Sequence, residues 1–272
     1  MMRRVLALAV LAVAPLMLAA PAAAQKVVLF DEGHGQRFLA GRAGDLDLSD
    51  FAAILKEGGC EVRSSRGRLD AAALKGVSAL VISGAFAPLD AAEIEVVGQF
   101  VLKGGRLAVM LHIGQPVQSL LEKMGLQYSR GTVHESEGVI KGRSGDFAVS
   151  RFEPHALTKG LASMSVFGCW ALKSGASSTA RVIARTGPQA WLDSDGNGAR
   201  SPGDLVGAQG MVAVGDVGAG SYVVFGDDAI FQNRFLKAYN AGIGARLARW
   251  LVPARAQKAP KQHPDSHGTT DL

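Results

Sequence analysis

The chain has 272 residues, of which 48% are hydrophobic and 19% are charged, and a formal net charge of +5. The positive charge is spread along the chain, without the basic stripe and interleaved aromatic residues of nucleic-acid-binding proteins, so we exclude nucleic acid as a partner. The length suits one large α/β domain or two small ones, and we predict no nucleotide or redox cofactor.

The N-terminal residues 1–24 have the three parts of a cleavable secretory signal peptide. Two arginines give a positive start, an apolar run follows from Val5 to Ala20, and small residues at Ala22 and Ala24 fit a signal peptidase. The alternative is a membrane anchor, but Pro15 interrupts the run, which is shorter than the ~20 residues of a spanning helix. We therefore predict a periplasmic or secreted protein with no integral membrane segment after cleavage.

Short apolar runs alternate with amphipathic helical patterns through the first half of the chain. We predict strands at 27–30, 60–62, 79–83 and 107–111, and helices at 48–57, 71–74 and 91–103. Continuous apolar strands separated by helices are typical of a parallel sheet that is covered on both faces. The pattern predicts an α/β fold of the flavodoxin-like, doubly wound type, with a mainly parallel sheet and helices on both faces.

The second half of the chain has a different pattern. Segments between about residues 131 and 205 are shorter and richer in Ser, Gly and Thr, and we interpret them as an irregular, β-rich insertion. Strands are predicted again at 211–214 and 221–225, and a closing helix at 233–250. These elements complete one predicted domain over residues 25–253, whereas the polar segment 254–272 has the composition of a disordered tail.

Five short motifs follow one another in a recognisable order. They are Phe30–Gly35, Leu80–Gly84, Phe100–Leu107, Gly218–Ser221 and Gly226–Asn233. This order resembles the class I glutamine amidotransferase-like superfamily, and it is most similar to the exported branch that carries a DUF4350-type or GIFT-type domain. The segment His155–Leu161 also resembles part of the related trehalose-utilisation-like domains. The resemblance covers most of residues 26–252 and implies an amidotransferase-like α/β fold.

The nucleophile of that superfamily is missing from this chain. Active members place a Cys within Gly-x-Cys-x-Gly on a turn between a strand and a helix, and the matching turn here, Met110–Gly114, has His112 at that place. Neither Cys60 nor Cys169 lies at such a turn. Because nucleophilic catalysis needs a thiolate beside a base, the sequence contradicts amidotransferase activity. Whether the two cysteines pair or remain buried thiols stays open.

Polar side chains follow several strands of the predicted sheet, where ligands bind in open α/β folds. Asp31, Glu32 and His34 follow the first strand, Gly84 and Phe86 the third, His112 and Gln115 the fourth, and Asp227, Asp228 and Asn233 the last. We select as candidate ligand-binding residues Asp31, Glu32, His34, Phe86, His112, Gln115, Asp227 and Asn233, with Asp31, His34, His112 and Asp227 as candidate catalytic groups. In the alternative interpretation, the two aspartates cap turns and His34 lies in a solvated loop.

A second polar motif begins at Asp193. Asp193, Asp195 and Asn197 alternate, Gly198 is sixth and Asp204 is twelfth, which matches the spacing of a calcium-binding loop except that Asp replaces the closing Glu. The shorter arm of Asp204 makes bidentate closure doubtful, and residues of these types also dominate ordinary turns. We predict a weak Ca²⁺ site at these four oxygen-bearing side chains, with a hydrophilic hairpin loop as the alternative.

These observations favour a binding module of the cell envelope that lacks amidotransferase activity. Its partner is expected to be a small molecule, a glycan or an envelope protein. The second hypothesis is a hydrolase that uses the Asp and His groups at the strand ends, with or without a metal ion, and a third is a purely structural component of the envelope. Fold alone does not license chemistry, so the choice depends on the geometry of the site.

Overall fold

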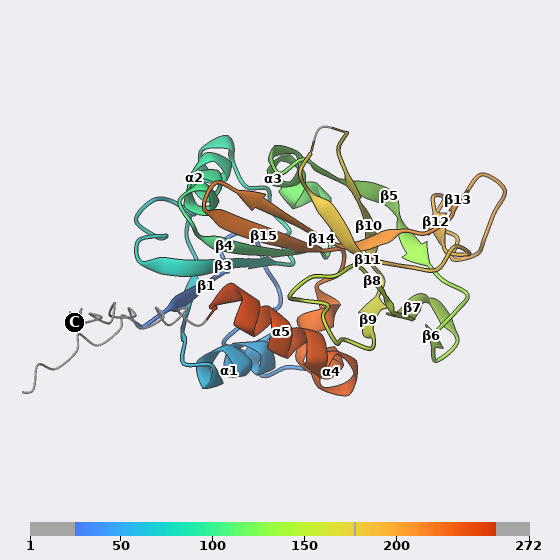
Figure 1. Cartoon of the computed structure of the whole chain (residues 1–272), viewed down its shortest axis with the longest axis horizontal. Helices are drawn as coiled ribbons and strands as arrows, with labels where there is room; N and C mark the ends of the chain where they lie inside the picture. The colour runs from blue at the N-terminus through green and yellow to red at the C-terminus, as the bar shows by residue number, and fades with distance from the viewer. Residues whose placement is uncertain (1–24, 177, 254–272) are drawn as a thin grey trace, which may run out of the picture.

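The computed structural model describes residues 25–176 and 178–253 (Figure 1). The predicted signal peptide and the predicted disordered tail lie outside these residues. Within the described part of the chain, no helix combines the length and the apolar character that a membrane crossing requires.

The central element is an eight-stranded mixed sheet with the order β2-β1-β3-β4-β15-β14-β11-β8. Five strands run parallel: β1 (Val27–Asp31), β2 (Glu61–Ser65), β3 (Val77–Ser83), β4 (Arg106–Met110) and β15 (Gly220–Phe225). Three strands extend the sheet in antiparallel pairing: β14 (Gly210–Val217), β11 (Arg181–Arg185) and β8 (Arg151–Phe152). The parallel part places the carboxyl ends of β1, β3, β4 and β15 at one edge.

The helices pack against two separate hydrophobic clusters. Phe51 of α1 (Ser49–Glu57) and Leu247 of α5 (Ala241–Leu251) share a cluster with Phe30 and Val81 of the sheet. The second cluster combines residues of α2 (Ala91–Leu102) and α3 (Gln118–Lys123) with the alternate strand residues, such as Leu80 and Leu107. Figure 1 shows α2 and α3 on one side of the sheet and α1, α4 (Asn233–Phe235) and α5 on the other. Because successive strand residues point to opposite faces, wholly apolar strands supply both clusters.

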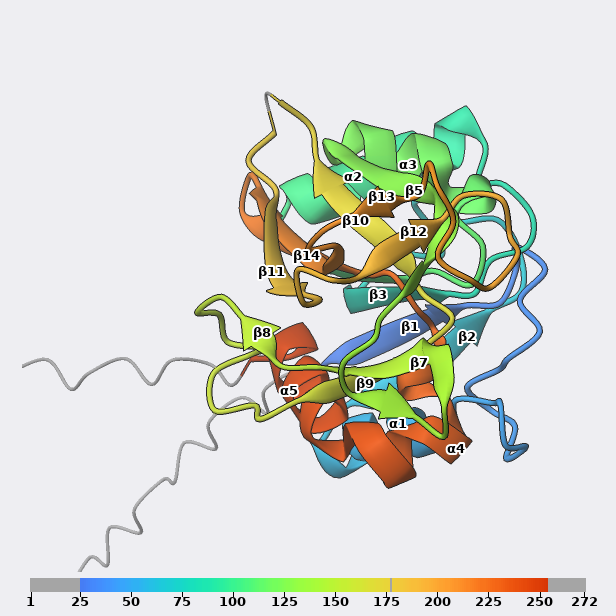
Figure 2. The ribbon, with the colours of Figure 1, turned by 90° about the vertical axis from the view of Figure 1, so that its right-hand side faces the viewer.

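Two smaller sheets are built from the middle of the chain. One has the order β10-β5-β12-β13, and the other β6-β7-β9. Their bounds are β5 (Leu126–His134), β6 (Val139–Ile140), β7 (Arg143–Val149), β9 (Met164–Phe167), β10 (Trp170–Ser174), β12 (Trp191–Asp193) and β13 (Leu205–Val206). In Figure 2 the first sheet lies near α3, and β7 and β9 lie near α4. β8 and β11 come from the same stretch of chain but belong to the main sheet.

The short helix predicted at 71–74 is wrong, because this segment forms consecutive turns. It has one helix-like bond, from the Leu74 N–H to the Asp70 carbonyl, and four residues do not repay the cost of nucleating a helix.

The two cysteines are free and buried. The Cys169 Sγ lies 3.3 Å from the Met211 Sδ, and burial raises the pKa of both thiols. The structure therefore favours inert core thiols over a disulfide.

Candidate functional site

His34 is held between two carboxylates beneath the end of β1. Its Nδ1 lies 2.8 Å from the Asp31 Oδ2, and its Nε2 lies 3.2 Å from the Glu93 Oε1. Glu93 belongs to the first turn of α2, where it forms a capping box with Asp90 and also accepts a hydrogen bond from the Leu69 N–H. Hydrogen bonding to Asp31 raises the pKa of His34, and burial opposes this.

This arrangement ties β1 to α2. His34 is 5% exposed and both ring nitrogens have carboxylate partners, so the solvated-loop interpretation of this residue is wrong. Neither Asp31 nor His34 lines the strand-end cavity described below. Asp31 and His34 therefore stabilise the packing of β1 against α2, and neither ring nitrogen of His34 is left to bind a ligand.

Three other predicted residues make local contacts within the fold. Glu32 accepts hydrogen bonds from the Ala40 N–H and the Ser64 hydroxyl. Asn233 accepts from the Asp50 N–H at the start of α1 and donates to the Gly44 carbonyl. Gln115 begins a short 3-10 helix, η1 (Gln115–Val117), and is exposed.

His112 occupies the turn after β4 and remains accessible. Its Nδ1 lies 3.2 Å from the Asp228 Oδ1, and 39% of its side chain is exposed. The rings of Phe38 and Phe86 pack against the imidazole at centroid distances of 5.4 and 5.0 Å, and the Arg37 guanidinium lies 4.4 Å from the Phe86 centroid. The hydrogen bond to Asp228 raises the pKa of His112, against the opposing effects of burial and Arg37.

Asp227 and Asp228 follow β15 and are 2% and 1% exposed. Both oxygens of Asp227 accept backbone hydrogen bonds, from the Phe167 N–H at 2.7 Å and the Ala229 N–H at 2.9 Å. Burial, reinforced by the neighbouring Asp228, raises the pKa of Asp227 well above its ordinary value. Burial likewise raises the pKa of Asp228, and its hydrogen bond to His112 partly offsets this.

The Asp228 Oδ2 is buried and accepts no hydrogen bond of good geometry among the described residues, although the Gln232 side chain lies close enough to help lower the pKa of Asp228. It faces Gly84 at the end of β3, where a Cβ would lie only 2.6 Å from this oxygen. Gly84 also has a φ of +58°, which glycine adopts without strain. A carboxylate oxygen without a good partner is costly when buried. Because less than 1 Å² of this atom is exposed, a bound molecule would reach it only after neighbouring side chains move.

A cavity of about 220 Å³ opens beside this pair. We call it the strand-end cavity, and its lining comprises Phe38, Leu46, His112, Arg143, Asp146, Phe167, Gly168, Asp227, Asp228, Ala229, Gln232 and Phe235. Two predicted residues, His112 and Asp227, therefore meet there, and Phe86 supports the His112 ring. Drug-sized ligands occupy cavities of ~300–1,000 Å³, so this one suits a smaller molecule.

Sequence reasoning missed the wall contributed by β7 and β9. Arg143 and Asp146 form an ion pair on β7, and the Phe167 ring at the end of β9 stacks on Phe235 at 4.0 Å. Asp228 appeared among the strand-end residues but not among the selected candidates. Its position directly after Asp227 was the one available signal.

The predicted calcium-binding residues lie together on the loop between β12 and β13. Asp193, Asp195 and Asp204 each offer an oxygen within 4.8 Å of the others. Asp193 accepts hydrogen bonds from the Gly196, Asn197 and Gly198 N–H groups. Burial opposes ionisation of Asp193, but these bonds lower its pKa overall. The loop amides thus satisfy the carboxylate that would begin a calcium site.

The chain belongs to the family described as "Domain of unknown function (DUF4350)", whose model matches residues 46–252. This confirms the DUF4350 part of the sequence resemblance, while the GIFT-type and exported parts stay predictions. A comparison with curated proteins finds no match.

Solved structures with the same general fold include the mmIFT52 N-terminal domain, at 18% identity and a TM-score of 0.67, covering 85% of this chain and 100% of that one. The cytoplasmic protein STM1381 from Salmonella typhimurium LT2 matches at 14% identity and a TM-score of 0.51, covering 84% and 99%. A weaker likeness, at 14% identity and a TM-score of 0.48, is to a ThuA-like protein from Parabacteroides merdae, covering 87% of this chain and 93% of that one. At these identities the likeness concerns the fold alone.

Proposed function

We propose that this protein is an exported, non-amidotransferase member of the class I glutamine amidotransferase-like fold that binds a small polar ligand in the strand-end cavity, as a module of the cell envelope. The order β2-β1-β3-β4-β15 supports this proposal, because ligands bind beyond the carboxyl ends of the strands in open parallel α/β sheets. The absence of Cys or Ser from Met110–Gly114 argues against the reaction of the superfamily.

The unpartnered Asp228 Oδ2 carries the proposal. A ligand hydroxyl or N–H that donates to this oxygen would satisfy a buried acceptor, which is worth more than a contact with a solvated group. His112 and Arg143 supply donors, and Phe167 and Phe235 supply apolar surface in the same cavity. This mixture favours an uncharged polyhydroxyl compound, and the small volume favours a single sugar ring.

A panel of uncharged monosaccharides, tested by calorimetric titration against the mature protein, examines this proposal. We expect at least one to bind, and Asp228→Asn to weaken that binding by about tenfold or more, since a carboxylate acceptor contributes ~1.5–3 kcal/mol. Glu95→Gln, which removes an exposed carboxylate on α2, is the matched control. Affinity that is unchanged in Asp228→Asn would exclude this cavity as the site.

The alternative function is hydrolysis, and the His112–Asp228 pair is the observation that favours it. An accessible imidazole oriented by a buried carboxylate is the arrangement of a general base that activates water. Within the described residues, the carboxylates that lie close enough together to hold a metal ion are on the β12–β13 loop. This observation gives no support to a metal-dependent hydrolase at the strand-end cavity. Turnover of an ester, amide or glycoside that His112→Ala abolishes would establish the hydrolase.

We also propose that the β12–β13 loop binds Ca²⁺ weakly through Asp193, Asp195, Asn197 and Asp204. The convergence of three carboxylates supports this, because hard cations prefer oxygen ligands. The Gly198 N–H donates to Asp193, the first residue of the motif, so a bound Ca²⁺ would compete with this hydrogen bond, and the affinity is expected to be low for this reason.

A further inference from the structure

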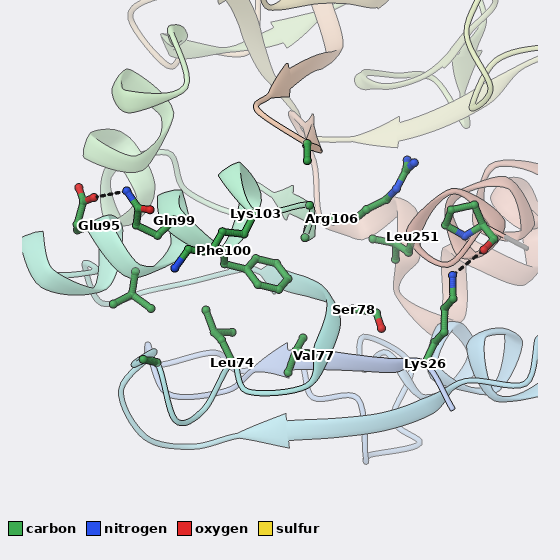
Figure 3. A pocket seen from close by; sticks show the side chains of 16 residues that line it. Lys26, Leu74, Val77, Ser78, Glu95, Gln99, Phe100, Lys103, Arg106 and Leu251 are labelled. Carbon is green, nitrogen blue, oxygen red and sulfur yellow. Dashed lines mark hydrogen bonds between the residues drawn. The ribbon is translucent and has the colours of Figure 1, made fainter. Parts of the chain in front are cut away.

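A larger cavity lies at the opposite edge of the sheet, near the amino ends of β3 and β4. Its volume is about 780 Å³, within the range of ligand-binding pockets. Leu74, Val77 and Phe100 point toward the same space in Figure 3, and the Phe100 ring covers Gly105, so one wall is apolar. This cavity shares no lining residue with the strand-end cavity.

A second hollow of about 450 Å³ adjoins this cavity and has a different character. Arg106 and Pro253 line both spaces, and Arg246, Arg249 and Trp250 line only the second. The Arg106 guanidinium lies 4.7 Å from the Trp250 ring centroid, and Figure 3 shows it directed away from Phe100. The larger hollow therefore has one apolar wall, the second hollow is lined by several arginines, and Arg106 belongs to the lining of both.

Positive charge dominates the two linings. The cations are Lys26, Lys103, Arg106, Arg246 and Arg249, and the carboxylates are Glu95 and Asp216. Glu95 is already paired with Lys123, and Asp216 accepts a hydrogen bond from the Ser221 hydroxyl.

Arg106 is half-buried and makes no direct ion pair with a described residue. Burial lowers its pKa, and the charge of Asp216 nearby partly offsets this effect. A partly desolvated guanidinium with no carboxylate in direct contact favours an anionic ligand, and its planar fork matches a carboxylate.

We propose that these joined cavities bind a long-chain monocarboxylate, with the carboxylate at Arg106 and Arg249 and the alkyl chain against Leu74, Val77 and Phe100. Each buried methylene adds favourable transfer free energy, and the guanidinium adds charge-assisted hydrogen bonds. This inference is independent of the proposed function because the site lies at the other edge of the sheet and uses none of its residues.

Calorimetric titration of the full mature chain with decanoate, below its micelle-forming concentration, tests the proposal. Decanoate is expected to bind, octanoate to bind about tenfold more weakly because it lacks two methylenes, and acetate to give no heat. The uncharged 1-decanol is expected to bind at least about tenfold more weakly than decanoate. No heat with decanoate, or equal affinity for decanoate and 1-decanol, would overturn the proposal.

Two variants and one control locate the head group. Arg106→Gln is expected to weaken decanoate binding about tenfold or more while leaving 1-decanol unaffected. Arg249 is exposed, and Arg249→Gln provides a second measurement if Arg106→Gln fails to fold. Arg249→Gln should also lower the affinity for decanoate. Arg151→Gln removes an exposed guanidinium elsewhere, on β8, and should bind as the wild type does. Wild-type affinity in both Arg106→Gln and Arg249→Gln would refute the site.

Discussion

At the scale of single residues, His112 and Asp228 depend on each other for their ionisation. His112 has a raised pKa in the folded protein, chiefly through its hydrogen bond to Asp228. Its contribution to stability is therefore fully present below the unfolded pKa of ~6.5 and is lost as pH rises through the higher folded pKa. The pair of protonated His112 and ionised Asp228 therefore stabilises the fold at pH values below the folded pKa of His112.

We predict that His112→Ala lowers the free energy of unfolding by about 1–2 kcal/mol near pH 6, since it leaves a buried acceptor without its partner. The value lies at the lower end because the ring is 39% exposed, and the cost should shrink near pH 9. Urea unfolding of the wild type and the variant at both pH values measures this. A cost that is equal at the two values would mean that His112 does not stabilise the fold through its charge.

His34 is a contrasting residue because it is buried between Asp31 and Glu93. We predict that His34→Ala costs about 3–5 kcal/mol of unfolding free energy, as breaking a buried charged network does. Ligand affinity at the strand-end cavity should stay unchanged, because His34 does not line it. Denaturation and calorimetry on the same sample separate the effect on stability from the effect on ligand affinity. A stable variant that has lost affinity would show that His34 is part of the binding site.

The sequence predicted part of this residue-level arrangement and not the rest. Asp31, His112 and Asp227 were placed at strand ends because apolar runs stop abruptly before them. Nothing local indicated that the carboxylate of Glu93, 59 residues after His34, would lie 3.2 Å from its Nε2. The pairing requires β1 and α2 to be packed together, which is a property of tertiary structure and not of spacing.

At the scale of elements, the strands of the parallel core were the easiest to predict. β1, β3 and β4 each contain a continuous apolar run because both of their faces are covered, and such runs are conspicuous. The strands of the small sheets are short or partly exposed, as in β5 and β7, and their patterns resemble loops. The wall of the strand-end cavity on β7 and β9 was missed for this reason.

The β12–β13 loop provides a test at the same scale. We predict that it binds Ca²⁺ with a dissociation constant on the order of 0.1–1 mM, as weak extracellular modules do. Asp193→Ala should abolish the heat of calcium binding, whereas Asp70→Ala, which removes an exposed carboxylate from another turn, should not. The absence of both heat and thermal shift at several millimolar calcium would leave the loop as a hydrophilic hairpin.

At the scale of the whole molecule, the proposed role in the envelope requires export. We predict that the native protein fractionates outside the cytoplasm and that its mature N-terminus is Gln25, because Ala22 and Ala24 define the cleavage site. Cell fractionation followed by N-terminal sequencing measures both. A cytoplasmic protein that retains Met1 would contradict the prediction without bearing on the geometry of either cavity.

The whole molecule presents two separated candidate sites on one sheet. The strand-end cavity is small and contains acidic groups with His112, whereas the joined cavities at the amino ends are larger and basic. Different ligands are therefore expected at the two edges, an uncharged sugar at the strand-end cavity and an anionic amphiphile at the amino ends. Asp228→Asn should leave decanoate binding intact, and Arg106→Gln should leave monosaccharide binding intact, so each proposal can fail alone.

The central claim is that the strand-end cavity binds a ligand through His112 and Asp228. The most direct measurement is NMR of the histidine rings while the monosaccharide panel is titrated into the mature protein. We predict that a binding sugar shifts the ring resonances and the pKa of His112, because it contacts the same carboxylate, while the buried His34 ring is unaffected. Binding that leaves the His112 resonances unchanged, or that perturbs His34 instead, would contradict the account.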